Sequence, residues 1–299
     1  MRELLTTFGI GLVSGVLSGA FGIGGGIITT PGIRLLLGAP ALVAVGTPLP
    51  VIFPSAITGA LNYHRRGMLD ARVAMWCGGF GSLFAVLGAI ATRWAGGTVV
   101  LLATAALLLY TAGDMVLQVI RPPRLGLEAS EERDAFASTD EPGIAREEGG
   151  AEGVGEPSVL LPRPPRLRST PTPTPTPLWK FALIGALTGS YSGFLGLGGG
   201  FVLVPLLTRW LGFSVKRAIG TSLAAITILA VPGTITHALL GHVDWRIAAT
   251  LVVGVVPGAW FGARITLGSS DRAVRIGFAI MLVVVGAWLG AAELGWLPR

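Results

Sequence analysis

The sequence predicts an all-α polytopic membrane protein made of two inverted repeats, each a glycine-broken helical hairpin followed by three transmembrane helices. Its composition and one repeated motif predict this fold class. Apolar residues make up 52% of the 299 residues and charged residues only 13%, whereas soluble domains carry about 25% charged residues. Most of the 45 glycines lie within apolar runs, where small residues let membrane helices approach closely.

The motif Ser-Gly-x-x-Gly-x-Gly-Gly-Gly occurs twice, at residues 18–26 and 192–200, an offset of 174 residues. Residues 8–92 align with residues 182–266 at this offset without a gap. The register also holds outside the glycines, where it pairs Pro31 with Pro205, Asp70 with Asp244 and Arg72 with Arg246. A chance match between glycine-rich segments does not preserve such pairs, so we infer an internal duplication.

Apolar runs divide each half into a broken first span and three further spans. The runs cover residues 4–22, 27–37, 44–62, 73–92 and 98–119 in the first half, and residues 181–196, 201–211, 218–239, 247–267 and 274–293 in the second. Residues 4–37 together would form about 50 Å of helix, too long for one crossing of a hydrocarbon core of about 30 Å. Since residues 27–37 are too short to cross alone, we predict a hairpin, wholly or partly re-entrant, that turns at residues 22–26 and again at residues 196–200.

A polar, proline-rich segment separates the halves. It contains an acidic stretch and ends in a Thr-Pro run at residues 170–177, which favours extended polyproline II structure over a packed core. The predicted organisation is a first membrane repeat at residues 1–120, a disordered cytoplasmic linker at residues 121–178 and a second membrane repeat at residues 179–299. We interpret the linker as a tether, with a docking or regulatory segment as the alternative.

The distribution of basic residues predicts the orientation in the membrane. If each glycine segment is a hairpin, the halves are inverted, and the linker face holds ten basic residues outside the linker: Arg65, Arg66, Arg72, Lys180, Arg209, Lys216, Arg217, Arg264, Arg272 and Arg275. The opposite face then holds five: Arg2, Arg34, Arg93, Arg246 and Arg299. If the halves were parallel, these basic residues would be divided almost evenly between the two membrane faces. The positive-inside rule therefore favours inverted halves, with a cytoplasmic linker and external termini.

Several other classes of protein do not fit. The single cysteine, Cys77, excludes an intramolecular disulfide and a CxxC metal site, and no His/Glu pair has zinc spacing, so we expect neither a metal nor a cofactor. The glycines match neither a Walker A loop nor a Rossmann fingerprint. The basic residues lie in loops on one face, so nucleic acid is not an expected partner. Glu3 interrupts the basic flank of a signal peptide, and residues 4–22 are interpreted as a mature helix.

The two glycine segments are the predicted substrate site. Paired backbone breaks in an internal repeat indicate a transporter site near the bilayer midplane. Helices that begin at Ile27 and Phe201 would direct free N–H groups at the turns and favour an anion. The alternative is that the glycines only permit close helix crossing. The candidate substrate-binding residues are the backbone donors Gly24, Gly25, Gly26, Gly198, Gly199 and Gly200 and the hydroxyl donors Ser18, Ser192, Thr47, Thr221 and Ser222, the last three with helix capping as the alternative.

Two ionisable residues within apolar runs are candidates for coupling transport to an ion. Asp114 lies in the run 98–119, and ionisable residues inside a membrane are usually functional. His237 is the second candidate because histidine ordinarily titrates near neutral pH, with an ordinary interfacial histidine as the alternative. Pro54 and Pro232 are expected to kink their helices.

The doubled motif, the following prolines, and the Gly-Thr-Pro and Gly-Thr-Ser triplets at residues 46–48 and 220–222 resemble the sulfite exporter TauE/SafE family, also called the 4-toluene sulfonate uptake permeases. The resemblance covers both halves but not residues 121–178. It implies transport of sulfite, sulfoacetate, sulfonates or similar anions across the bacterial inner membrane. The 58-residue linker is longer than the resemblance implies.

Three functions are compared. The favoured one is a secondary transporter of small sulfur-containing or organic anions that works by alternating access, with a proton or sodium as the coupling ion. A passive anion channel is the alternative. An intramembrane serine hydrolase, with Ser18 or Ser192 as nucleophile and His237 as base, is less favoured because the histidine occurs in only one half, so the protein is expected not to be an enzyme. Expected partners are the anion, the bilayer and, as an open alternative, a second copy of the chain.

Overall fold

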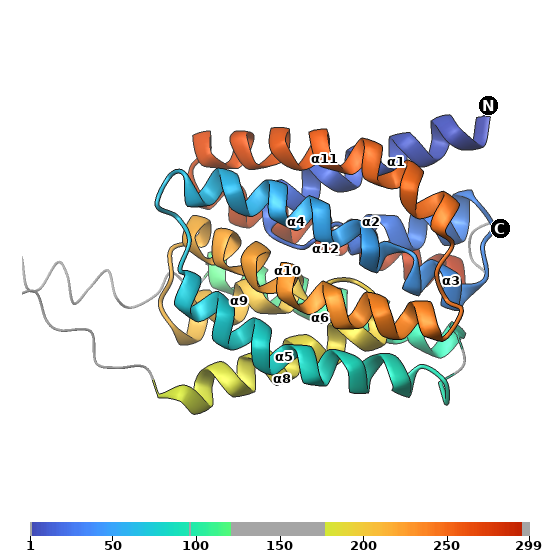
Figure 1. The fold of residues 1–299 in the computed structure, drawn as a ribbon. Helices are drawn as coiled ribbons and strands as arrows, with labels where there is room; N and C mark the ends of the chain where they lie inside the picture. Colours follow the sequence, from blue (N-terminus) through green and yellow to red (C-terminus); the bar gives the residue numbers. More distant parts are fainter. Residues whose placement is uncertain (1, 96, 121–176, 295–299) are drawn as a thin grey trace, which may run out of the picture. The chain divides into compact units, whose positions relative to one another are not determined.

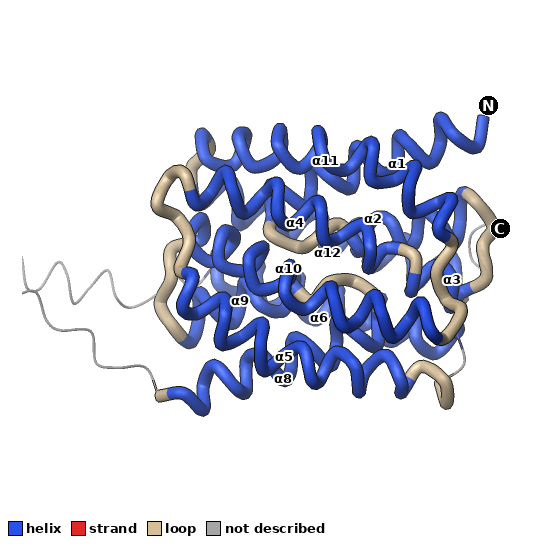
Figure 2. The backbone as a smooth tube through the Cα atoms, in the orientation of Figure 1, coloured by secondary structure: helices blue, strands red, loops and turns tan. Residues whose placement is uncertain are grey.

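The computed structural model describes residues 2–95, 97–120 and 177–294, and every secondary-structure element in them is a helix (Figures 1 and 2). Together the two membrane halves form one compact unit. The predicted all-α polytopic fold is confirmed. Residues 121–176 of the predicted linker lie outside the described residues, so their disorder and cytoplasmic location stay predictions.

Helix bounds follow the predicted apolar runs to within a few residues. The first half contains α1 (Arg2–Phe21), α2 (Gly26–Pro31), the π-helix η1 (Gly32–Leu36), α3 (Ala41–Gly46), α4 (Pro48–His64), α5 (Ala71–Ala91) and α6 (Gly97–Ile120). The second half contains α8 (Leu178–Leu195), α9 (Gly200–Trp210), α10 (Val215–Leu239), α11 (Trp245–Gly268) and α12 (Asp271–Glu293). Each half therefore has a first helix, a glycine break, a short second helix and three long segments.

The halves differ where proline occurs in one of them only. The first half divides its third segment into α3 and α4, because Pro48 lacks the N–H that would continue the backbone ladder. Ser222 occupies the corresponding position in the second half, and α10 runs unbroken through it. Proline alone does not explain the π-helix after Pro31, since Pro205 lies within the continuous helix α9.

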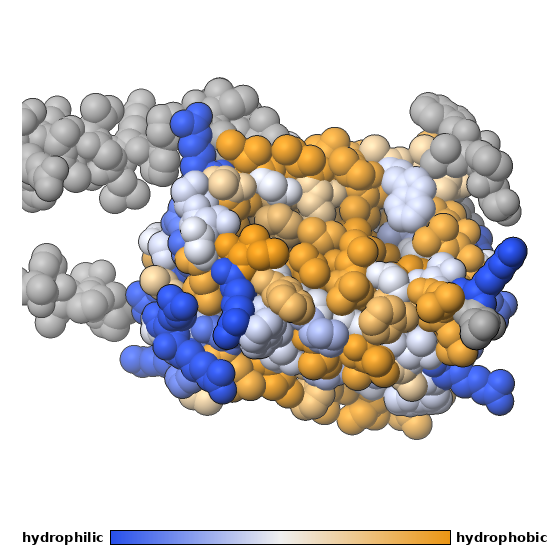
Figure 3. Space-filling model, turned by 90° about the horizontal axis from the view of Figure 1, so that it is seen from above, coloured by the Kyte–Doolittle hydropathy of each residue, from blue (hydrophilic) through white to orange (hydrophobic). Residues whose placement is uncertain are grey.

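Six helical segments of the described residues are long and apolar enough to cross a membrane: Arg2–Phe21, Ala41–His64, Ala71–Ala91, Val215–Leu239, Trp245–Gly268 and Asp271–Ala292. Figure 3 shows an apolar surface over the middle of the molecule, with hydrophilic residues gathered towards its two ends. Large apolar side chains such as Leu83, Val253 and Val284 are exposed on the long helices. Such a band suits contact with lipid rather than water.

The first helices of the two halves enter the bundle from opposite ends. In Figure 1, α1 begins at the end of the bundle where α12 finishes, whereas α6 finishes and α8 begins at the other end. Helices α4 and α10, which occupy equivalent places in the two halves, also run in opposite directions. The described boundaries of the linker therefore share one end of the bundle.

Each first helix packs against the other half. Helix α1 lies along α11, and its counterpart α8 lies along α5. Glycines at every fourth position form the contact surfaces, and a Cβ atom built at Gly11 would lie 2.5 Å from the Leu251 carbonyl oxygen. A Cβ at Gly185 would lie equally close to the Cys77 carbonyl oxygen. This is the small-residue packing of membrane helices, and it holds each glycine break inside the opposite half.

Two equivalent hydrogen bonds join the halves at the ends of the bundle. The Asp70 amide donates to Thr221 Oγ1, and the Asp244 amide donates to Thr47 Oγ1, both at 3.0 Å. The two aspartates also cap α5 and α11, since the Asp70 carboxylate accepts from one backbone N–H in the first turn of its helix and the Asp244 carboxylate from two. Asp70 additionally forms an ion pair with Arg217 at 2.8 Å.

Candidate functional site

The two glycine turns, residues 22–26 (the first turn) and residues 196–200 (the second turn), lie against each other in the interior. Figure 2 shows loop segments in the middle of the bundle, away from the loops at its ends. A Cβ atom built at Gly26 would lie 2.6 Å from Leu197 Cα, and one at Gly200 would lie 2.7 Å from Ile23 Cα. The backbones therefore approach more closely than any side chain would allow.

Two isoleucines at equivalent positions cover the turns. A Cβ atom built at Gly24 would lie 3.0 Å from Ile52 Cγ2 on α4 and 3.2 Å from Ile226 Cγ2 on α10. A Cβ at Gly198 would lie 2.9 Å from Ile52 Cδ1. Both isoleucines are buried. The isoleucines of α4 and α10 thus pack directly over the turns.

The amide side of each turn has no side-chain cap. Gly25 and Gly199 precede α2 and α9 with φ of 89° and 72°, a left-handed conformation that strongly favours glycine. Neither helix receives a side-chain hydrogen bond at this position. The first N–H groups of a helix have no partner within the helix itself, and they carry partial positive charge. The uncapped starts of these helices therefore supply hydrogen-bond donors to the turns.

The carbonyl side of the turns, in contrast, is occupied. The Tyr63 hydroxyl donates to the Gly19 carbonyl oxygen at 3.1 Å, and His237 Nε2 lies 2.9 Å from the equivalent carbonyl oxygen of Gly193. Two further hydroxyls bind carbonyl oxygens of the first turn region, Thr266 at Ala20 and Ser222 at Gly22, both at 2.9 Å. Side chains from α4, α10 and α11 thus form hydrogen bonds with the carbonyl oxygens where α1 and α8 end. The backbone N–H donors at the starts of α2 and α9 have no such side-chain partners.

The serine hydroxyls beside the turns differ between the halves. In the first half, Ser55 Oγ donates to Ser18 Oγ at 2.8 Å, so the Ser18 hydroxyl has a partner. In the second half, Leu229 occupies the position equivalent to Ser55. Ser192, which is 1% exposed, has no hydrogen-bond partner for its Oγ among the described residues.

Thr188 shows the same difference one helical turn earlier. Its counterpart Ser14 donates to the Gly25 carbonyl oxygen, whereas Thr188 Oγ1 is buried without a partner among the described residues. A Cβ atom built at Gly199 would lie 2.7 Å from Thr188 Cγ2 and 3.2 Å from Ser192 Cβ. Buried hydroxyls are usually hydrogen-bonded, so these two unpaired groups beside the second turn indicate a polar function there.

The other predicted site residues have different partners. The Thr47 and Thr221 hydroxyls accept from loop amides, and Ser222 donates to Gly22, so these three are engaged with the protein itself. Asp114 belongs to α6, but its side chain lies outside the described residues. Pro54 and Pro232 lie inside α4 and α10, as expected.

Sequence reasoning missed several residues beside the turns, namely Ser14, Ser55, Tyr63, Thr188 and Thr266, and it missed the contact of His242 with His237. Tyr63 could have been found from the sequence, because it is the residue equivalent to His237 at the offset of 174 residues. The nitrogens of His237 contact the Gly193 carbonyl oxygen and His242, so its ring is engaged with groups other than the candidate nucleophiles Ser18 and Ser192. This geometry gives no support to a serine hydrolase.

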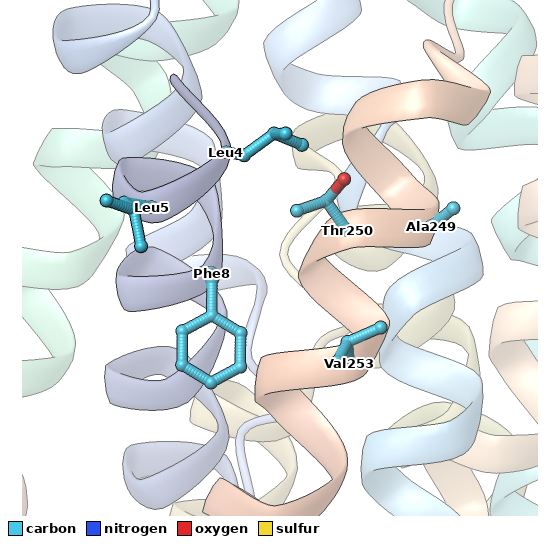
Figure 4. A pocket seen from close by; sticks show the side chains of 6 residues that line it. All are labelled: Leu4, Leu5, Phe8, Ala249, Thr250 and Val253. Atoms are coloured by element: carbon cyan, nitrogen blue, oxygen red, sulfur yellow. The ribbon is translucent and has the colours of Figure 1, made fainter. Parts of the chain in front are cut away.

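A surface hollow between α1 and α11 lies apart from the turns (Figure 4). It is lined by Leu4, Leu5, Phe8, Ala249, Thr250 and Val253. Its single hydroxyl, on Thr250, bonds to the Arg246 carbonyl oxygen at 3.1 Å, so the hollow offers an anion little. Across residues 2–95, 97–120 and 177–294, no group of three or more His, Cys, Asp or Glu side chains is arranged to hold a metal ion.

The family described as sulfite exporter TauE/SafE matches residues 7–289 of the chain. The chain is 33% identical over 110 residues to the probable membrane transporter protein YunE of Bacillus subtilis, an alignment that covers 36% of the chain and 39% of that relative. It is 22% identical over 294 residues to the probable membrane transporter protein MJ0441 of Methanocaldococcus jannaschii, covering 94% and 92%.

The probable membrane transporter protein YdhB of Bacillus subtilis is 24% identical over 253 residues, covering 84% of the chain and 86% of the relative. Relatives with the higher identities, such as YunE and a probable membrane transporter protein of Xylella fastidiosa strain 9a5c, are matched over only about two fifths of their length, at 39% and 43%. No solved structure shows a significant match to the chain.

Proposed function

Because the chain belongs to the sulfite exporter TauE/SafE family, we propose that it is a secondary transporter of small sulfur-containing or organic anions across the cytoplasmic membrane by alternating access. The relatives named as probable membrane transporters support the general class. The family description names sulfite, and the proposal extends the substrate class to sulfonates. The substrate and the mechanism are part of the proposal.

One observation contributes most to the choice of an anion. At the two facing turns, side chains from neighbouring helices occupy carbonyl acceptors, whereas the starts of α2 and α9 have no side-chain cap. Donors in a dry interior stabilise negative charge far more than they do in water, because the surrounding dielectric is low. A small oxyanion bound beside the second turn would find backbone N–H groups and the free hydroxyls of Thr188 and Ser192.

The packing around the turns supports alternating access over an open pore. Ile52 and Ile226 close the turns from α4 and α10, at equivalent positions in the two halves. Each of these helices contains a proline, at which a helix bends readily because a backbone hydrogen bond is missing. We propose that α4 and α10 move in turn, so that one isoleucine and then the other uncovers the anion. A channel would need both uncovered at once.

The opposite directions of α1 and α8 support the inverted-repeat prediction, and the basic residues favour a cytoplasmic linker. We therefore expect single cysteines at positions 2 and 294, in a Cys77→Ser background, to react with an impermeant maleimide added to intact cells. A cysteine at position 150 should react only after the membrane is opened. Labelling of position 150 in intact cells, with protection of both ends, would contradict this orientation.

The difference between the serines predicts unequal effects of two matched substitutions. We expect Ser192→Ala to lower the rate of sulfite exchange in proteoliposomes by about tenfold, the effect of losing about 1.4 kcal/mol of hydrogen bonding to a charged ligand. Ser18→Ala should change the rate much less, because Ser18 is paired with Ser55.

A third variant tests the same reasoning by adding a group. Leu229→Ser places a hydroxyl where Ser55 stands in the first half, so it can occupy the Ser192 hydroxyl. We expect this variant to slow exchange although it creates no charge and removes no donor. Equal effects of Ser18→Ala and Ser192→Ala would contradict the assignment of the second turn as the more open side.

The channel alternative has a distinct signature. A channel passes anions down their electrochemical gradient and produces current that does not depend on an anion on the opposite side. A transporter exchanges labelled for unlabelled anion and sustains transient accumulation by counterflow. Counterflow in proteoliposomes that contain purified protein therefore distinguishes the two functions.

A further inference from the structure

Two of the three histidines of the chain are in contact, beside the carbonyl that ends the first helix of the second half. His242 Nδ1 lies 3.3 Å from His237 Nδ1, and the ring centroids are 5.4 Å apart. His237 is completely buried near the end of α10. His242 is partly exposed in the loop between α10 and α11, at the end of the bundle where α1 begins (Figure 1). The pair thus links this end of the molecule to its interior.

The hydrogen bonds determine which nitrogens hold protons. The Gly193 carbonyl oxygen can only accept, so His237 Nε2, 2.9 Å away, must carry its proton. Neutral His237 then has an unprotonated Nδ1, and His242 Nδ1–H must be the donor in the contact between the rings. In this arrangement Nε2 of His242 is unprotonated, which makes it the position where an incoming proton binds.

The first half has no equivalent of this pair. Tyr63 replaces His237 and makes the same kind of bond, from its hydroxyl to the Gly19 carbonyl oxygen at 3.1 Å. Met68 occupies the position equivalent to His242 at the offset of 174 residues. The structural role of the contact, capping a carbonyl at the end of the first helix, therefore needs no histidine. Two histidines in contact require a different explanation in the second half.

Several groups around the pair affect where a proton is held, and burial disfavours a positive charge on His237 when no anion is bound. Burial and the Arg93 guanidinium, which follows α5, lower the pKa of His242. The carboxylate of Asp244, two residues further along the loop, accepts from backbone amides at the start of α11. Helix α3 faces His242 with the backbone of Gly46, and α8 faces His237 with the Gly193 carbonyl oxygen, in its last turn. The C-terminal end of a helix carries partial negative charge, which favours an imidazolium there.

We propose that His242 and His237 form a proton-binding pair that couples anion transport to a proton, an inference that rests on the function proposed above. A proton binds His242 Nε2, and the proton on His242 Nδ1 moves to His237 Nδ1. His242 is then neutral again, and His237 holds the positive charge. No bond other than N–H forms or breaks, and no further reactant is needed.

The positive charge arises close to the proposed anion site. Gly193 lies three residues before the second turn, on the helix that also carries Thr188 and Ser192. Opposite charges attract strongly in a medium of low dielectric, so a proton on His237 and an anion at the turn bind more tightly together than separately. The pair therefore makes the transporter a symporter that carries a proton with its anion, and the two charges cancel for a monovalent anion.

The experiment uses purified full-length protein in proteoliposomes with an internal pH dye and a clamped membrane potential. Methanesulfonate is the probe because, unlike sulfite, it does not itself take up a proton near neutral pH. We expect an acid exterior to drive its accumulation in the wild type, with acidification of the interior. At one proton per anion, a gradient of about one pH unit supports about tenfold accumulation.

Two variants and one control separate coupling from folding. His242→Gln and His237→Tyr should lose proton-driven accumulation, and His242→Gln should retain methanesulfonate exchange at equal pH. His237→Tyr keeps a donor for the Gly193 carbonyl oxygen, as Tyr63 does in the first half, so the fold is retained. The matched control is His64→Gln, because His64 is an exposed histidine at the end of α4 and should leave both measurements unchanged.

The outcomes are distinguishable. Wild-type exchange without proton movement, or full proton-driven accumulation in both histidine variants, would overturn the proton pair and leave the proposed function in place. Absence of exchange of methanesulfonate, sulfite and sulfate in the wild type would overturn the proposed function, and the proton pair with it.

Discussion

Gly200→Ala is expected to reduce anion exchange by about tenfold or more, while the protein still inserts in the membrane and purifies as a single species. An added Cβ atom at this position overlaps the Gly22 carbonyl oxygen and lies 2.7 Å from Ile23 Cα. Both neighbours are backbone atoms of the other turn, so the strain is relieved only if the turns separate. Overpacking costs about 1–3 kcal/mol, and 1.4 kcal/mol corresponds to a tenfold change. Counterflow of labelled sulfite measures the effect.

Gly79→Ala is the matched control for this substitution. Gly79 lies on the exposed side of α5, with no atom within 4 Å of the added Cβ. The Gly79→Ala protein should therefore exchange anions at the wild-type rate. Gly26→Ala should behave as Gly200→Ala does, because its added Cβ lies 2.6 Å from Leu197 Cα in the opposite turn. Unchanged exchange in both turn variants would show that the contact between the turns is not part of the transport site.

Gly193→Leu is expected to prevent assembly of the folded protein altogether. An added Cβ atom at Gly193 overlaps the Ala85 carbonyl oxygen and lies 2.7 Å from the Ala85 carbonyl carbon. Helix α8 would have to leave α5, and this contact is one of the two most extensive helix pairs that join the halves. The loss exceeds the roughly 3 kcal/mol of ordinary overpacking, because no rotamer change removes an overlap with backbone. Fluorescence-detected size-exclusion chromatography and a thermal melt measure it.

The control for the packing prediction lies on the other first helix. Gly9 belongs to α1, and an added Cβ there has no atom within 4 Å, so Gly9→Leu should give a normal elution profile and melting temperature. A monodisperse Gly193→Leu protein with wild-type stability would contradict the interlocked arrangement of the halves.

The long helices and the glycine breaks could be predicted because their signals are local. Crossing a bilayer requires a continuous apolar run, and the runs ending near Phe21 and Leu195 stop at glycines that cannot be part of one long span. The division between α3 and α4 was missed. A run of apolar residues gives no sign that Pro48 interrupts the helix in one half, when Ser222 continues it in the other.

The supporting side chains could not be predicted, because their partners are distant in sequence. Tyr63 bonds to a carbonyl 44 residues away, and Ser222 to one 200 residues away. Thr47 and Thr221 are predicted ligand donors because they follow glycines, and the structure adds that each accepts a hydrogen bond from a loop amide of the opposite half. Such contacts depend on how the halves interlock, which hydropathy and spacing do not specify.

In a duplicated chain, equivalent positions that agree between the halves can be distinguished from positions that differ. Where both halves keep the same contact, as in the two carbonyls capped by Tyr63 and His237, the shared feature serves the fold. Where they differ, as in Ser55 and Leu229, one half has a hydrogen bond to the serine beside its turn and the other half does not. On this reasoning, the second turn is the more specialised side of the proposed site.

Counterflow in proteoliposomes tests the central claim most directly. Vesicles containing purified protein are loaded with unlabelled sulfite and diluted into a trace of labelled sulfite, beside vesicles that contain Gly200→Ala. We expect labelled sulfite to accumulate transiently above its external concentration in the wild type and not in the variant. Equilibration without overshoot, together with a current that does not depend on internal anion, would contradict alternating access at the glycine turns.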